Sequence, residues 1–525
     1  MQRTLYPSAR SANFGRAAVA ASEPVAASAG LMMLARGGTA VDAAIATAAT
    51  LTVTEPVSNG LGSDAFALVS DGGPVAGLNA SGRSPAAWTP ERFAGMDAMP
   101  RRGFDTVTIP GAVSAWVALH ERYGRLPFAE VLAPAIRAAR EGYGVGPVTA
   151  ASWERQLPMM TGQPGWDATF APNGRAPAAG ERFVFPAAAN ALELIAETEG
   201  EAFYKGDIAA AIVAASQAGG GAHTMADFAA HTADWVTPVT QRCGALTVHE
   251  IPPNGQGIAA LIALGILERV DLGDAPDSPH SIHMQIEAVK LALADIYTHV
   301  ADIEAMVIRP EDLLEPAYLD ERAALIDPTR AQAFETGKPL QGGTVILCAA
   351  DEQGMMISFI QSNYEGFGSG CVEPNFGISL QNRGAGFNLT PGSPNRVGPG
   401  KRPFHTIIPA FATEGDTPVM AFGLMGGPIQ AQGHTQMMIR MERFGQGVQT
   451  AIDAPRFRVL EGLEVAVETH FEPATIEGLA ERGHLLKPEA PNVAFGFGGA
   501  QAIRKVGDLY AAGSDPRKDG HAVVL

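Results

Sequence analysis

The amino-acid sequence predicts a fold of mixed helices and strands, helix-rich in its first two-thirds and strand-rich after residue 342. Three observations support this prediction. Ala-rich runs with apolar residues at helical spacing recur through the first part of the chain. The later part contains short runs rich in Val, Ile and Phe, separated by Gly-containing turns. The 60 glycines and 38 prolines are spread along the whole chain, which indicates many short connections.

Two helices are expected near the N-terminus, over residues 26–35 and 40–50, because apolar side chains recur there at helical spacing. The Gly37-Gly38 pair between them is typical of a helix C-cap followed by a turn. Further helices are expected over residues 113–123, 128–141, 188–197 and 281–300. The last of these begins near a helix start signal at residues 277–279.

Strands dominate the C-terminal part of the sequence. Residues 344–351 and 354–361 are two β-rich runs with a Gly-containing turn between them. The runs at residues 406–412 and 417–425 repeat this pattern. We therefore expect two successive pairs of strands.

A linker that ends at Gly342-Gly343 is the best internal boundary. Residues 327–339 precede it, and their polar composition predicts an exposed loop. The boundary divides the chain into a helix-rich part, residues 1–343, and a strand-rich part, residues 344–525. No repeat of fixed period is present, so the sequence does not support a solenoid or a propeller.

The composition favours an enzyme of small molecules over a nucleic-acid or membrane protein. With 525 residues, of which 46% are hydrophobic and 18% charged, the chain can bury a sizeable core. This excludes a disulfide-rich miniprotein and a disordered chain. The 37 Lys and Arg against 55 Asp and Glu give a formal net charge of −18, which repels phosphate backbones and anionic lipids. We expect neither nucleic acid nor a membrane as a partner.

Cysteine usage and the N-terminal sequence predict a cytoplasmic protein. Cys243, Cys348 and Cys371 are too few and too scattered for a disulfide framework or a Cys-rich zinc site. Polar and charged residues interrupt residues 1–30, so the apolar region of a signal peptide is missing. The apolar stretch at 39–53 falls short of the roughly 18 uncharged residues that a membrane span needs.

Familiar catalytic signatures are missing from the sequence. It contains no GxxxxGK[ST] phosphate loop, HExxH zinc helix, CxxC pair or GxSxG elbow. We therefore expect no metal and no cofactor. Thr344 is more informative because it begins a predicted strand directly after two glycines. Threonine is also an ordinary strand residue, so this position alone does not establish catalysis.

The predicted hairpin gives Thr344 a partner. If residues 351–355 form a three-residue loop with Gly354 in the left-handed position, Thr344 faces Ser362 across the strand pair. Opposed residues share a face, with side chains about 5 Å apart, so the two hydroxyl groups could hydrogen-bond. Cross-strand Thr–Ser pairs also occur for purely structural reasons, and the register could differ by one residue.

Several segments carry a family resemblance. After residue 343 they are TVILCAADEQGMMISFIQSNYEGFGSGCVEPNFGISLQNRGAGF, GKRPFHTIIPAF and FGLMGGPIQ. Before it they are ARGGTAVDAAIATAATLTVTEPVSNGLGSDAFALV, TIPGAVSAWVALHERYGRLPFAEVLAPAIRAAREG, IPPNGQG and HMQIEAVKLALADI. These segments resemble, in the same order, the small and large subunits of the gamma-glutamyltranspeptidase family of N-terminal nucleophile hydrolases. The resemblance spans nearly the whole chain, and several motifs in register are more specific than any one of them.

The resemblance implies an α+β fold, the four-layer αββα sandwich of N-terminal nucleophile hydrolases. It also implies that the precursor cuts itself at the Gly343–Thr344 bond into a large subunit, residues 1–343, and a small subunit, residues 344–525. The two subunits would form a heterodimer that can dimerise further. Thr344 would become the nucleophile, and its new α-amino group, with an unperturbed pKa of about 7.7–8.0, would act as general base.

Three further residues match catalytic positions of the family. Ser362 matches a second hydroxyl residue that orients the nucleophile, although threonine is usual there. Gly426 and Gly427 match paired glycines whose backbone N–H groups bind the oxyanion. A tight turn is the alternative role for such a pair.

The sequence departs from the family where gamma-glutamyl enzymes hold the α-amino and α-carboxylate groups of their substrate. Those enzymes use an Asn, a Gln, an Asp, a pair of serines and an Arg. The corresponding positions here hold Tyr364, Arg383, Gly386, His405-Thr406 and Ser81. The Gln and Asp that would accept hydrogen bonds from the ammonium group are therefore missing, which argues against gamma-glutamyl specificity.

Tyr364, Arg383, His405 and Thr406 are the expected substrate-binding residues. The fork of Arg383 suits a carboxylate, although a structural arginine is equally compatible with the sequence. The set resembles the branch of the family that includes oxamate amidohydrolase. We therefore expect a self-processing threonine amidohydrolase that hydrolyses a small carboxylate-bearing amide. The alternatives are a gamma-glutamyltransferase or glutathione hydrolase, and a non-catalytic scaffold.

Overall fold

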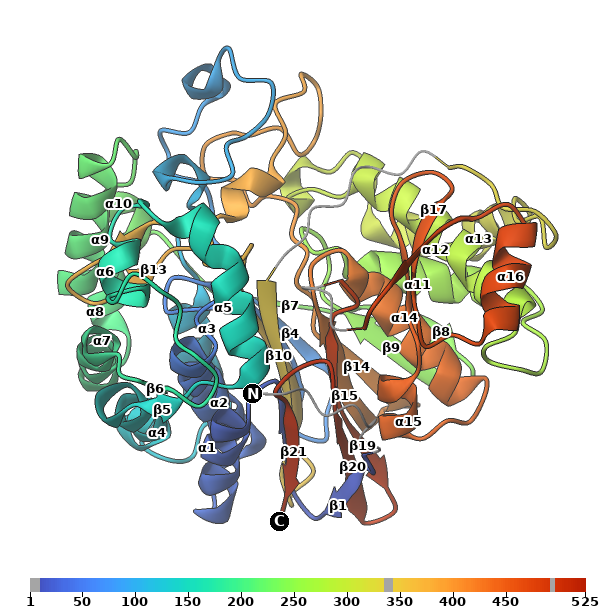
Figure 1. The fold of residues 1–525 in the computed structure, drawn as a ribbon, viewed down its shortest axis with the longest axis horizontal. Coiled ribbons are helices and arrows are strands. Elements are labelled where there is room, and N and C mark those ends of the chain that lie inside the picture. The colour runs from blue at the N-terminus through green and yellow to red at the C-terminus, as the bar shows by residue number, and fades with distance from the viewer. Residues whose placement is uncertain (1–9, 335–342, 492–495) are drawn as a thin grey trace.

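The computed structural model describes residues 10–334, 343–491 and 496–525. Two seven-stranded antiparallel sheets stack face to face at its centre, and helices cover the outer face of each sheet (Figure 1). This is a four-layer αββα sandwich, so the predicted α+β fold is confirmed. Gly342, one half of the predicted boundary, lies outside the described residues.

The first sheet carries the candidate nucleophile. In spatial order its strands are β21 (His521–Val524), β2 (Ala18–Ala21), β10 (Gly343–Ala350), β11 (Met356–Tyr364), β3 (Asp64–Ser70), β4 (Ala76–Asn79) and β7 (Asp234–Val236). Strands β10 and β11 lie near the middle of this sheet. Their residues are therefore shielded by neighbouring strands on both sides.

The second sheet faces the first one. Its strands, in spatial order, are β1 (Asn13–Gly15), β20 (Leu509–Ser514), β19 (Gly499–Val506), β15 (Thr417–Met425), β14 (Ala410–Glu414), β9 (Leu246–Glu250) and β8 (Val239–Cys243). Strands from both sides of Gly343 contribute to each sheet. A cut at this residue would leave two fragments that share both sheets.

Each outer layer comes from a different set of helices (Figure 1). The first sheet is flanked by α1 (Pro24–Ala35), α2 (Ala40–Thr54), α3 (Ala112–Tyr123), α4 (Phe128–Glu141), α5 (Pro147–Met160), α6 (Trp166–Phe170), α7 (Pro186–Glu197), α8 (Glu201–Tyr204), α9 (Asp207–Ala218) and α10 (Met225–Ala229). The second is flanked by α11 (Gly257–Leu267), α12 (Pro279–His299), α13 (Pro316–Ala323), α14 (Ile429–Glu442), α15 (Val448–Asp453) and α16 (Pro473–Glu481).

Short elements complete the fold. They are β5 (Tyr143–Gly144) with β6 (Arg182–Phe183), β12 (Val372–Glu373) with β13 (Ile378–Ser379), and the small sheet of β16 (Phe457–Val459), β17 (Glu464–Glu468) and β18 (Leu485–Glu489). Five 3-10 turns are also described, η1 (Pro90–Phe93), η2 (Phe104–Thr106), η3 (Ile303–Ala305), η4 (Pro310–Leu314) and η5 (Arg383–Gly386). Among the described residues, no helix has the length and apolar character to cross a membrane.

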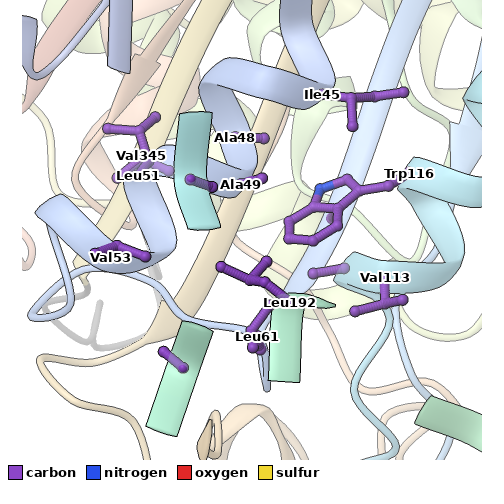
Figure 2. Close-up of a cluster of buried hydrophobic side chains, with 14 of the residues drawn as sticks. Ile45, Ala48, Ala49, Leu51, Val53, Leu61, Val113, Trp116, Leu192 and Val345 are labelled. Atoms are coloured by element: carbon purple, nitrogen blue, oxygen red, sulfur yellow. The ribbon is translucent and has the colours of Figure 1, made fainter. Parts of the chain in front are cut away.

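Three apolar layers hold the sandwich together. One lies between the first sheet and its helices, one between the second sheet and its helices, and one between the two sheets. In the first layer, Trp116 of α3 points toward α2, with Leu192 of α7 below it in the view (Figure 2). The side chain of Trp116 also donates from Nε1 to Gln361 Oε1 of β11 at 3.1 Å. Packing on this face therefore fixes the hairpin that carries the candidate site.

The predicted helices are confirmed, with shifts of a few residues at their ends. The segment at 40–50 extends to Thr54 in α2, which is buried on every side. A capping box begins this helix: Asp42 N–H donates to Thr39 Oγ1, and Thr39 N–H donates to Asp42 Oδ2. Gly30 of α1 allows the two N-terminal helices to pack closely, because a Cβ there would lie 2.3 Å from Thr47 Oγ1.

The strand predictions are confirmed with one correction. The predicted strands at 344–351, 354–361 and 417–425 correspond to β10, β11 and β15. Residues 406–409 are not a strand, and β14 begins only at Ala410. Their backbone groups are bonded elsewhere, because Ile407 N–H donates to His405 Nδ1 and Ile408 N–H donates to Gln430 Oε1. The sequence also gave no sign of the strands before residue 343.

Candidate active site

Thr344 lies at the start of β10 and is 1% exposed. Its Oγ1 is 3.1 Å from Ser362 Oγ on β11. The predicted hairpin register is confirmed from Val345, which pairs with Gln361. The register shifts by one residue before that point. The predicted loop is also present, with Gly354 at φ +99°.

Ser362 connects the Thr344 hydroxyl to the peptide bond that precedes it. Ser362 Oγ donates a hydrogen bond to the carbonyl oxygen of Gly343 at 2.7 Å. It accepts one from the backbone N–H of Tyr364 at 2.8 Å. Because the only proton of Ser362 is used on Gly343, the Thr344 hydroxyl is the donor in the Thr344–Ser362 contact. The Gly343 carbonyl is thereby polarised beside the nucleophile candidate.

Arg383, the first residue of η5, is fully buried beside this pair. Its Nη1 donates to Thr406 Oγ1 at 3.0 Å, and its Nη2 lies 3.4 Å from Ser362 Oγ. The guanidinium carbon lies 4.1 Å from the ring centre of Tyr364, a cation–π contact. Burial lowers the pKa of Arg383 to about 10, so the group remains cationic at neutral pH. Residues predicted from three separate segments therefore contact one another: Ser362 with Tyr364 from one segment, Arg383 from the second, and Thr406 from the third.

His405 faces a carboxyl group that sequence reasoning missed. Its Nε2 lies 3.2 Å from Asp64 Oδ2, and its Nδ1 accepts a hydrogen bond from Ile407 N–H. Burial and the nearby Arg383 hold the pKa of His405 well below its usual value, so the neutral ring donates from Nε2. His405 therefore orients Asp64 and does not itself add a positive charge.

Asp64 begins β3 directly across from Ser362 in the β3–β11 pairing. Burial raises its pKa to about 7, against the opposing effect of Arg383. The sequence signal was an acidic residue at the head of the apolar run DAFALVS, which the structure buries completely. An isolated charge in such a strand is a sign of a functional or paired group.

Gly426 and Gly427 form the turn between β15 and α14. Their φ angles are +123° and +71°, which glycine adopts without strain. Ser358 of β11 donates to Phe422 O at 2.8 Å, and a Cβ on Gly423 would lie 2.8 Å from Ile346 Cδ1. Ser358 pairs with residue 348 of β10, so higher numbers on β15 lie over lower numbers on β10. The glycine turn therefore follows the end of β15 that lies over the start of β10.

The positions that replace the family's remaining substrate contacts are structural. Ser81 is buried, donates to Asn79 Oδ1 at 2.7 Å and accepts from Asn254 Nδ2 at 3.2 Å. Gly386 ends η5, where a Cβ would lie 2.6 Å from Phe404 O. Neither position supplies a charge. Arg383, by contrast, brings a charged side chain beside Ser362.

Within the described part of the chain, one group of potential metal ligands lies outside this cluster. His283, Glu287 and His484 bring their ligand atoms within 4.8 Å of one another. Lys290 Nζ already lies 2.7 Å from Glu287 Oε1, and His283 Nδ1 lies 2.8 Å from His484 Nε2. His283 Nε2 also lies 2.8 Å from Asp327 O. His484 Nδ1 is buried without a hydrogen-bond partner among the described residues, while the contacts of His283 and Lys290 fasten the segment after α13 to α12.

Comparison with known proteins agrees with this geometry. The family model described as Gamma-glutamyltranspeptidase matches residues 26–525. The chain is 36% identical over 511 residues to the glutathione hydrolase-like YwrD proenzyme of Bacillus subtilis, covering 95% of this chain and 96% of that protein. It is also 36% identical over 512 residues to the oxamate amidohydrolase proenzyme of Klebsiella pneumoniae, with the same coverage.

A solved structure shows the same fold over the whole chain. The crystal structure of cephalosporin acylase from Bacillus halodurans superposes with a TM-score of 0.96 at 43% identity, covering 100% of this chain and 99% of that one. The similarity to known proteins therefore extends over the whole chain and is not limited to separate motifs. The chain is a member of the gamma-glutamyltranspeptidase family of enzymes.

Proposed function

We propose that this enzyme is a self-processing amidohydrolase that uses Thr344 as its nucleophile and hydrolyses a small amide bearing a carboxylate. The observation that carries the proposal is the cluster in which Ser362 contacts both Thr344 and the buried Arg383. This arrangement supports a reacting hydroxyl with an anion-binding group at a short distance from it. The intact set of Thr344, Ser362 and Gly426-Gly427 argues against a non-catalytic scaffold.

In processing, Thr344 Oγ1 attacks the carbonyl carbon of Gly343. The C–N bond between Gly343 and Thr344 breaks as the ester forms, and the Thr344 nitrogen takes up the proton. Water then hydrolyses the ester to give a large fragment of residues 1–343 and a small fragment of residues 344–525. The Ser362 hydroxyl supports this step because it already donates to the Gly343 carbonyl oxygen. Since the fragments share both sheets, they remain together as a heterodimer.

In turnover, the freed α-amino group of Thr344 accepts the proton of its own hydroxyl, and Oγ1 attacks the substrate amide. The N–H groups of Gly426 and Gly427 bind the oxyanion of the tetrahedral intermediate. The leaving nitrogen takes the proton as the C–N bond breaks. Water then attacks the acyl ester on Thr344 and releases the acid. Transfer to an amine in place of water is a minor outcome.

The substrate preference rests on Arg383 and its surroundings. The guanidinium hydrogen-bonds to the hydroxyl groups of Thr406 and Ser362, and its Nε–H is without a partner among the described residues. A substrate carboxylate would supply acceptors for these donors. Tyr364 lies against the guanidinium, and His405 donates to the nearby Asp64. The similarity to an oxamate amidohydrolase proenzyme supports a short amide of this kind.

Gamma-glutamyl hydrolysis or transfer is the second candidate. It is favoured by Asp64, a carboxyl group in the same cluster that could accept from a substrate ammonium group. A similar protein also carries the name glutathione hydrolase-like. The two candidates differ in whether the substrate carries an ammonium group beside its carboxylate.

Side-by-side turnover of oxamate and glutathione by the processed enzyme tests the proposal. We expect oxamate to be the better substrate. Arg383→Ala should raise KM for oxamate by about tenfold or more, because a charged hydrogen bond contributes about 1.5–3 kcal/mol. Arg383→Lys keeps the positive charge but loses the forked guanidinium. Its KM for oxamate should lie between those of the wild-type enzyme and Arg383→Ala. Efficient glutathione turnover that is insensitive to Arg383→Ala would overturn the proposed substrate.

A further inference from the structure

The positive charge of Arg383 needs a counter-charge inside the protein. The side chain is fully buried, and its hydrogen bonds within the described residues go to the uncharged hydroxyl groups of Thr406 and Ser362. A buried cation that lacks an opposite charge is costly, even when its hydrogen bonds are satisfied. An anionic group near Arg383 would therefore stabilise its charged form.

Asp64 is placed to be that anion. It faces Ser362 across the β3–β11 pair, Ser362 Oγ lies 3.4 Å from Arg383 Nη2, and the charge of Asp64 acts on Arg383. Its two oxygens accept hydrogen bonds from His405 Nε2 at 3.2 Å and from the backbone N–H of Gly82 at 3.1 Å. Both donors favour the ionised carboxylate, whereas burial favours the protonated form and raises the pKa to about 7.

We propose that Asp64 and Arg383 form a proton-linked receptor for the substrate carboxylate. While the site is empty, the ionised Asp64 balances Arg383. When a substrate carboxylate binds Arg383, Asp64 takes up one proton from solvent, and the site avoids burying an excess negative charge. This inference rests on the proposed function, because it requires a substrate that carries a carboxylate. It makes Asp64 a specificity-determining residue for the substrate carboxylate.

The other groups that face Asp64 are poor acceptors for this proton. His405 already donates to Asp64, and its pKa is held well below its usual value. Arg402, the second cation that acts on Asp64, is paired with Asp234 through Nη1 at 2.7 Å. The charge of Asp64 also acts on the Tyr204 hydroxyl. Burial raises the pKa of Tyr204, so this hydroxyl remains protonated in the neutral range.

Glu365 is the other carboxyl group that acts on Arg383. Two cations already hold it, with Arg101 Nη2 at 2.5 Å and Arg102 Nη1 at 2.6 Å.

After cleavage, the α-amino group of Thr344 is a further group that titrates near neutral pH. The experiment must therefore distinguish a proton on Asp64 from a proton on this amine.

Oxalate is a suitable probe, because it is the product of oxamate hydrolysis and stays fully ionised through the neutral range. Calorimetric titration of the processed enzyme in two buffers of different ionisation enthalpy counts the protons taken up per oxalate bound. We expect about one proton per oxalate near pH 8, and almost none near pH 5.5, where Asp64 is already protonated. The Kd should rise about tenfold per pH unit above the pKa of Asp64.

Asp64→Asn should abolish the proton uptake and make the Kd for oxalate independent of pH. The amide oxygen can still accept from His405 Nε2, which keeps its proton because Nδ1 accepts from Ile407 N–H, whereas the hydrogen bond from Gly82 N–H is lost. Glu250→Gln is a matched control. Glu250 forms a fully buried pair of the same kind with His434, at 2.7 Å on β9 and α14, and its variant should retain the uptake.

Oxalate binding without proton uptake in the wild-type enzyme would overturn the inference. Uptake that survives Asp64→Asn would overturn it as well, and would assign the proton to the amine of Thr344. Both results leave the amidohydrolase proposal intact. An enzyme that binds no oxalate and hydrolyses no oxamate would overturn both proposals. If Asp64→Asn does not fold, the wild-type data decide, and a Kd that is constant between about pH 6 and 8.5 overturns the inference.

Discussion

Thr344 and Ser362 place their hydroxyl oxygens 3.1 Å apart across the β10–β11 hairpin, and Ser362 donates in turn to the carbonyl oxygen of Gly343. The two contacts connect the candidate nucleophile with the bond that it would cut. Processing and turnover can therefore use the same pair of hydroxyl groups. The predictions below separate these roles from the general stability of the hairpin.

Thr344→Ala should remain a single uncut chain, because the attacking hydroxyl is lost. Thr344→Ser keeps the hydroxyl and should still yield two fragments. Electrophoresis followed by N-terminal sequencing of the smaller fragment measures the outcome. Two fragments from purified Thr344→Ala, with a sequence beginning at residue 344, would show that the proposed self-cleavage is wrong.

Ser362→Ala should slow processing, because the Gly343 carbonyl loses its 2.7 Å hydrogen bond and Thr344 loses its acceptor. We expect a loss of tenfold or more in the rate of cleavage, corresponding to about 1.5–3 kcal/mol. Ser358→Ala is the matched control, since it removes a buried serine of the same strand that bonds to Phe422 O. The prediction fails if both variants are cut at the wild-type rate during a time course.

Gly427→Ala should reduce kcat by about 10²–10³-fold, the usual effect of losing an oxyanion donor. The φ of +71° strains an alanine by roughly 1–2 kcal/mol and shifts the backbone N–H. Gly415→Ala is a matched control with φ +57° in the β14–β15 turn, where a Cβ meets no atom within 4 Å. Equal kcat values for the two variants would remove Gly427 from the oxyanion site.

Asp515 should make the stability of the protein sensitive to acid. Arg456 Nη2 lies 2.7 Å from Asp515 Oδ2, and two arginines and two backbone N–H groups hold the pKa of Asp515 at about 2. The folded pKa lies below the unfolded value of about 3.9, so this stabilisation is present above that value and is lost as pH falls toward 2.

Asp515→Asn should therefore lower Tm at pH 7 and reduce the dependence of Tm on pH between about 5 and 2. Breaking a buried charged pair costs about 3–5 kcal/mol. Asp508→Asn, at an exposed position in the β19–β20 turn, provides the control. Scanning calorimetry over this pH range measures both effects, and parallel Tm curves for Asp515→Asn and wild type would contradict the prediction.

The sequence by itself determined the local elements and one part of the site. The run of strand residues on each side of Gly354 was enough to pair Val345 with Gln361 and to bring Thr344 beside Ser362. A hairpin permits this because loop length and the two-residue period of a strand fix its register locally. Helices such as α4 were predictable for a similar reason, because their periodic apolar faces are written in consecutive residues.

Strands before residue 343 could not be recognised in the same way. All residues of β3 are buried, so the run DAFALVS lacks the alternation that identifies a strand with one exposed face. For the segment 406–409, the sequence predicted a strand that the structure does not contain. Its β-forming residues suggested a strand, but the imidazole of His405 and the amide of Gln430 bind its backbone N–H groups. Local propensity does not include such distant side-chain partners.

Only the tertiary structure decided the electrostatics of the site. Asp64, Arg383 and His405 come from segments far apart in the sequence, and the sheet pairing and the turn at η5 bring them together. The sequence indicated Arg383 and His405 but gave no partner for either, and it did not indicate Asp64. Charge balance depends on burial and on distances between groups, and those are fixed by how the strands assemble rather than by the order of residues along the chain.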